Sequence, residues 1–88
     1  METLEREVAH GAHVVTITVN EQPVKITGPK ATGRQIKQAA IDQEVKIELS
    51  FVLSEEMPNR RTQIVGDNDE VTVHPGSKFV AVAPDDNS

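Results

Sequence analysis

The chain has 88 residues, a formal net charge of -5, no cysteine, and two phenylalanines as its only aromatic residues. This length predicts one small domain with an aliphatic core, and the absence of cysteine excludes disulfides, thiolate metal sites and a cysteine nucleophile. The acidic balance argues against nucleic acid and against membrane surfaces as partners, because both are bound through clusters of Lys and Arg.

Residues 1–12 form a polar leader in which Leu4 and Val8 are the sizeable apolar residues after Met1. A segment this short is marginal as an isolated helix, so we expect a flexible N-terminal arm. Its acidic start lacks the apolar region of a signal peptide, and no window of the sequence is apolar enough for a membrane helix. We therefore expect a cytoplasmic protein.

Residues 13–27 predict an antiparallel hairpin. Val15, Ile17 and Val19 recur at every second position in a stretch rich in β-branched residues, which suits a half-buried strand. Residues 20–23 predict the turn and residues 24–27 the return strand, which Gly28 and the following proline end.

Residues 31–43 carry the one convincing helical pattern. Thr32 suits the N-cap, and Gln35 completes a capping-box pattern three residues later. The spacing predicts an apolar face made of Ile36, Ala39 and Ala40, and an opposite polar side made of Arg34, Lys37, Gln38 and Asp42.

Residues 45–53 show the clearest alternation of apolar and polar side chains and predict a long strand with one buried face. A polar loop is expected over residues 54–61. Short extended segments follow at 61–65 and 71–73, separated by the turn residues 66–69. After a second turn at 75–77, the apolar run 79–83 predicts a buried final strand.

This order of elements predicts an α+β fold, because a single helix intervenes among the strands. Two strands, a helix across one face and a last strand that returns beside the first make the β-grasp (ubiquitin-like) arrangement with a mixed sheet. The expected organisation is an arm over residues 1–12, a domain over 13–83 and an exposed C-terminal tail over 84–88, which carries no large apolar side chain.

No cluster of residues supports catalysis or metal binding. His10 and His13 have a spacing seen in some metal sites, but a third ligand is not assigned. Asp67, Asp69 and Glu70 resemble part of a calcium loop without its central glycine and distal glutamate, so a polar turn is the simpler interpretation. We expect a protein that is not an enzyme and holds neither metal nor cofactor.

Surface recognition is the better supported expectation. On the predicted long strand, the solvent side carries Lys46, Glu48, Ser50 and Val52. An apolar patch results if Val80 and Val82 also face outward; alternatively, these two valines pack under a loop. Arg60 and Arg61 form a cationic pair that either meets an acidic partner or is simply solvated.

Several runs resemble the bacterial ubiquitin-like proteins of the multiubiquitin family. They are VTITVN at residues 15–20, ITGPKATG at 26–33, IKQAAI at 36–41, VGDNDEVTVHPGSKF at 65–79 and the ending DDNS at 85–88. The resemblance covers about residues 13–88 and leaves out the leader. It implies a β-grasp fold, which agrees with the expectation from the pattern.

The resemblance also implies a bacterial ubiquitination-like pathway. Its partners would be an E1-like activating enzyme that uses ATP and magnesium, an E2-like carrier, and a processing or deconjugating peptidase. The conjugated tail would be Asp85, Asp86, Asn87 and Ser88. Ubiquitin and the sulfur carriers of this fold end in two glycines, whereas the last glycine here is Gly76. This departure disfavours a sulfur carrier, and it leaves open whether Ser88 or Asn87 is activated.

Two hypotheses follow. In the first, the chain is a ubiquitin-like protein modifier whose tail is the reactive end. In the second, it is a β-grasp interaction module that binds a partner non-covalently through a sheet face or edge.

Overall fold

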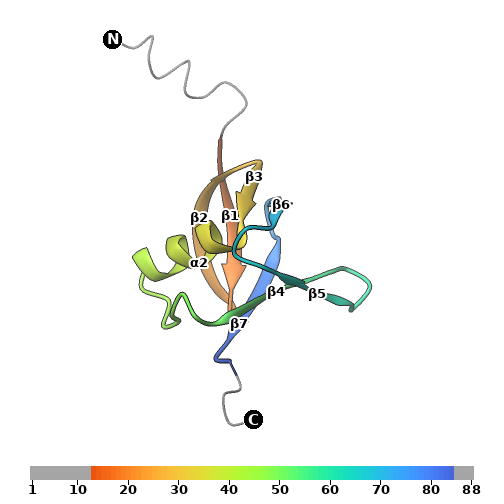
Figure 1. Cartoon of the computed structure of the whole chain (residues 1–88). Coiled ribbons are helices and arrows are strands. Elements are labelled where there is room, and N and C mark those ends of the chain that lie inside the picture. The colour runs from red at the N-terminus through yellow and green to blue at the C-terminus, as the bar shows by residue number, and fades with distance from the viewer. Residues whose placement is uncertain (1–12, 85–88) are drawn as a thin grey trace, which may run out of the picture.

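A computed structural model describes residues 13–84 of the chain. A five-stranded mixed sheet has the strand order β2-β1-β7-β4-β5, and one helix, α2, lies across one of its faces (Figure 1). A second, two-stranded sheet joins β3 to β6. The predicted α+β, β-grasp arrangement is therefore confirmed. The predicted N-terminal arm and residues 85–88 of the predicted tail lie outside the described residues.

The first hairpin forms as predicted. β1 (His13–Val19) and β2 (Gln22–Gly28) pair antiparallel over their full length, so that Val15 faces Ile26 across the ladder. The connecting turn is shorter than predicted, because only Asn20 and Glu21 lie between the strands. Both have positive φ angles, 53° and 69°, which is the turn geometry that matches the twist of a tight hairpin.

The helix α2 (Gly33–Asp42) begins at the predicted cap. The Thr32 hydroxyl accepts from the Gln35 N–H, and the Gln35 side chain accepts from the Thr32 N–H, which completes the capping box. The predicted start at residue 31 is wrong: Ala31 belongs to β3 (Lys30–Thr32), which pairs antiparallel with β6 (Glu70–Thr72). Ladder pairing with β6 holds this segment extended up to the cap.

The predicted strand over residues 45–53 is wrong in most of its length. The strand β4 is Val52–Glu56, and residues 45–51 form an irregular connection from the helix to it. Val45 and Ile47 are nevertheless buried, so the alternation of apolar and polar residues reflects which side chains are buried and not the pairing of a strand. The predicted loop over 54–61 is consequently wrong at its first three residues.

The predicted pairing of the last strand with the first is confirmed. β7 (Lys78–Val82) is the middle strand of the sheet, parallel to β1 and antiparallel to β4. Its Phe79 and Ala81 are buried under the helix side of the sheet. The strand β5 (Thr62–Val65) forms the outer edge beyond β4, with which it pairs antiparallel.

The core lies between the helix and one face of the five-stranded sheet. Its largest fully buried side chains are Phe79, Ile17, Ile36, Leu53, Val15, Val19 and Val24. Apart from one aromatic ring these are aliphatic, as the composition predicts. No helix in residues 13–84 is both long and apolar enough to cross a membrane.

Candidate functional site

The end of β7 is fixed by a side chain from the first hairpin. The Asn20 amide oxygen accepts from the Ala81 N–H at 2.8 Å, and its amide nitrogen donates to the Ala81 carbonyl at 3.0 Å. Asn20 therefore extends the ladder between β1 and β7 by one side-chain rung. Beyond this rung Val82, Ala83 and Pro84 are exposed. The chain thus leaves the middle of the sheet from a firmly held strand and is exposed as far as Pro84, the last residue that the structure describes.

An apolar patch lies on the sheet face opposite the helix, beside this exit. Val52 of β4 and Val82 of β7 face each other across the ladder and are 37% and 53% exposed. Val80 is half-buried on the same face, and Ile64 of β5 is 67% exposed. Of the two alternatives that the sequence left open for Val80 and Val82, the structure therefore has the outward one. Ile64 was not singled out from the sequence, although its place opposite Ser54 puts it on this face.

The other predicted surface residues do not join this patch on one strand. Lys46, Glu48 and Ser50 are exposed but lie on the irregular connection, so the prediction that they share a strand face with Val52 is wrong. Arg60 and Arg61 are exposed in the β4–β5 loop, at the far end of the hairpin from Val52. A partner role for these residues stays a prediction.

A shallow hollow lies where the β4–β5 loop meets the turn before β7. Its lining includes Glu55, Arg61, His74, Ser77 and Lys78. Partial burial raises the pKa of the Glu55 carboxyl above its usual value, and the nearby His74 lowers it by a smaller amount. The hollow has both signs of charge and no nucleophile paired with a base, which gives it no evident catalytic arrangement.

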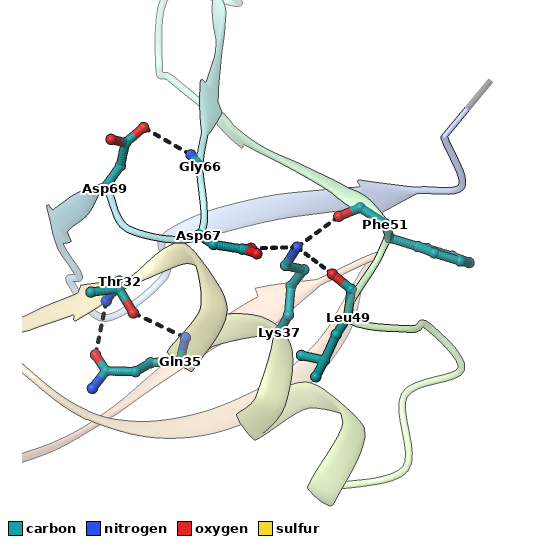
Figure 2. Close-up of polar contacts among 8 residues, drawn as sticks. All are labelled: Thr32, Gln35, Lys37, Leu49, Phe51, Gly66, Asp67 and Asp69. Carbon is teal, nitrogen blue, oxygen red and sulfur yellow. Dashed lines mark hydrogen bonds and ion pairs between the residues drawn. The ribbon is translucent and has the colours of Figure 1, made fainter. Parts of the chain in front are cut away.

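Lys37 was placed on the polar side of the helix by the sequence pattern, and this is wrong. Its residue is only 4% exposed, and its ammonium donates to the carbonyls of Leu49 and Phe51 at 2.6 and 2.8 Å (Figure 2). Its third contact is an ion pair with Asp67 at 2.8 Å. Lys37 thus ties the irregular connection and the 66–69 turn to the helix.

This contact also perturbs Asp67. The hydrogen bond from Lys37 is the largest cause that lowers the pKa of the Asp67 carboxyl below its usual value of 3.8. The charged Asp67 turn is therefore a structural contact rather than a calcium loop. The signal available in the sequence was the position of Lys37 one residue after buried Ile36, at the border of the apolar face.

Metal ligands do not gather in the part of the chain that the structure describes: no group of three or more His, Asp or Glu is placed to hold an ion among residues 13–84. His13 is exposed at the start of β1. Its predicted companion His10 lies outside the described residues.

Comparison with known families supplies the deciding observation. The model of the multiubiquitin family matches residues 15–85, from the third residue of β1 to the residue after Pro84. The chain belongs to the multiubiquitin family. Neither a curated protein nor a solved structure matches it. The family match covers the helix and every strand of the structure except the first two residues of β1, so membership and fold agree, and it includes Asp85 but not the last three residues.

Proposed function

We propose that the chain is a ubiquitin-like protein modifier, with residues 84–88 as the segment that is activated and conjugated. Membership in the multiubiquitin family supports the proposal. The observation that carries it is the exit of β7, where Asn20 holds Ala81 on both of its backbone groups and the chain is exposed from Val82 to Pro84. Such an anchor presents a short segment to an enzyme while the folded body serves as a recognition handle.

The chemistry would be acyl activation by a partner. The α-carboxylate of Ser88, or that of Asn87 after a peptidase has hydrolysed the Asn87–Ser88 bond, would bond to the α-phosphorus of ATP in an E1-like enzyme, and pyrophosphate would leave. A nucleophile of the E2-like carrier would then displace AMP, and a target amine would displace the carrier. Asp85 and Asp86 would be bound by cationic side chains of the enzyme groove. The modifier itself would catalyse nothing, and magnesium and ATP would belong to the activating enzyme.

The test is incubation of the full chain with its cognate activating enzyme, ATP and magnesium, followed by mass spectrometry. The expected product is an acyl adduct through the 84–88 segment. Deletion of residues 85–88 should abolish it. Asn20→Gly, which loosens the strand exit but keeps the segment, should reduce adduct formation less than the deletion does. Undiminished adduct formation by the deletion variant would refute the proposal.

The second candidate is a non-covalent interaction module. The pairing of Val52 with Val82 on an exposed sheet face favours it, because apolar side chains grouped on a surface commonly mark a protein contact. Under this hypothesis Val52→Asp abolishes partner binding in a pull-down, whereas deletion of residues 85–88 does not. Val14→Asp is the matched control, since Val14 is an exposed strand valine outside the Val52–Val82 pair.

A further inference from the structure

The two outer strands of the five-stranded sheet have unlike edges. On β2, Pro23 has no N–H to offer, and both backbone groups of Lys25 are occupied by the side chain of Gln43. The Gln43 amide accepts from the Lys25 N–H at 2.9 Å and donates to the Lys25 carbonyl at 2.7 Å. A strand edge whose groups are missing or already bonded is a poor template for another strand. The edge at β2 is therefore largely closed.

The edge at β5 is open. The Arg61 carbonyl accepts from the Met57 N–H at 2.7 Å, which fixes the phase of the β4–β5 ladder. In an antiparallel ladder, successive residues point their backbone N–H and C=O groups alternately toward the partner strand and away from it. The backbone groups of Gln63 therefore point toward β4, and those of Thr62 and Ile64 point away from it. Within residues 13–84, no hydrogen bond reaches these outward groups of Thr62 or Ile64. The hairpin that carries them stands at the side of the molecule away from α2 (Figure 1).

We propose that β5 pairs antiparallel with β5 of a second copy of this chain, about a two-fold axis at Gln63. In this register Thr62 of one copy faces Ile64 of the other, and each such pair exchanges two backbone hydrogen bonds. The two five-stranded sheets then continue into one. The exposed Ile64 side chain gains the Thr62 methyl of the second copy as a neighbour on the open face.

The charges around β5 favour a second copy in this orientation. Arg60 and Arg61 precede the strand, and Asp67 and Asp69 follow it, all exposed. The Asp67 side chain remains 47% exposed although it is paired with Lys37. Antiparallel pairing brings the start of one strand beside the end of the other, so each cationic pair meets the acidic turn of the second copy. Parallel pairing would set like charges together, which is unfavourable. The segment is thus complementary to itself in one orientation only.

The size of this contact sets the expected strength. β5 has four residues, of which two offer outward backbone groups, so the interface is at the small end of specific interfaces. We expect a reversible dimer with a Kd on the order of 0.1 to 1 mM. Because the flanking contacts are exposed ion pairs, dissociation increases with salt concentration.

The experiment uses the full chain in a concentration series. Amide chemical shifts and translational diffusion are measured by NMR at concentrations below and above the expected Kd. Slower diffusion at high concentration is expected, with the largest shift changes in residues 62–65 and small ones in β2. Diffusion that does not change with concentration, or shift changes confined to Val52 and Val82, would overturn the proposal.

Two variants and one control distinguish this contact from nonspecific association. Ile64→Pro removes an N–H that the ladder with β4 does not use, so the fold is expected to remain and dimerisation to be lost. Arg61→Glu is expected to weaken dimerisation about tenfold or more. Lys46→Glu makes the same charge change on the exposed connection that follows α2 and leaves the dimer as it was. Dimerisation of Arg61→Glu at the level of Lys46→Glu would contradict the proposed orientation.

Discussion

Replacement of Lys37 by methionine tests the buried ammonium contacts that the sequence pattern did not predict. Methionine keeps the length and the apolar stem but removes the ammonium that donates to the Leu49 and Phe51 carbonyls and pairs with Asp67. A hydrogen bond to a charged donor contributes about 1.5–3 kcal/mol. The full sum is not lost, because Leu49 and Phe51 are half-buried and can be partly hydrated, and because the desolvation cost of the lysine disappears with it. The expected loss of unfolding free energy is about 2–4 kcal/mol.

The assay is urea denaturation followed by far-ultraviolet circular dichroism, since the chain has no Trp or Tyr for fluorescence. Lys46→Met is the matched control, because Lys46 is an exposed lysine of the same irregular connection, and it should change stability by less than about 0.5 kcal/mol. Asp67→Asn removes the ion pair but leaves both carbonyl contacts, so its effect should be clearly smaller than that of Lys37→Met. A Lys37→Met variant as stable as the control would refute the reasoning, and an equal loss in Asp67→Asn would show that the ion pair dominates.

Three further predictions test single contacts. Gly33→Ala should destabilise the protein by about 1–3 kcal/mol in thermal denaturation, because the added Cβ would stand 2.3 Å from the Gly66 carbonyl oxygen; a neutral effect would mean that the turn moves aside easily. Asn20→Gly keeps the positive φ unstrained and removes two hydrogen bonds, so the Ala81 amide should exchange faster with solvent at a cost of about 1–2 kcal/mol, and unchanged protection would show that Asn20 does not hold the end of β7. Because the pKa of Asp67 is lowered in the folded state, its carboxylate stabilises the fold above pH 3.8, and this stabilisation is lost as the pH falls through the lower folded-state pKa. The stability of Asp67→Asn should therefore fall less below pH 3.8 than that of the unaltered chain, and parallel stability curves would contradict this.

Local signals in the sequence account for the elements that were predicted correctly. The hairpin over residues 13–27 follows from strict alternation around a tight turn, and the helix start follows from Thr32 and Gln35, whose contacts span three residues. The return of the last strand beside the first followed from the order of the elements together with the rules that limit their connections. The family resemblance pointed to the same fold, and the match over residues 15–85 confirmed it.

The errors arose where one pattern has two physical solutions. Alternation over residues 45–53 is met by a strand, but also by an irregular connection that buries Val45 and Ile47. The second solution holds here because Lys37 takes two carbonyls of that connection, and Lys37 reaches them only once the helix is packed on the sheet. The candidate site was affected accordingly, since Val52 kept its place on the open face while Lys46, Glu48 and Ser50 did not join it.

The sequence by itself determined the class of the fold, the cap of its helix, the central place of β7 and the family, because these depend on near neighbours in the chain or on the order of elements. Only the tertiary structure decided which lysine is buried, which amide closes the edge of β2 and which strand keeps an open edge. The contacts behind the buried lysine and the closed edge join residues 12 and 18 positions apart, as Lys37 to Leu49 and Lys25 to Gln43 show. Periodicity carries no information at such separations, since contacts of this kind exist only after the helix and sheet have packed together.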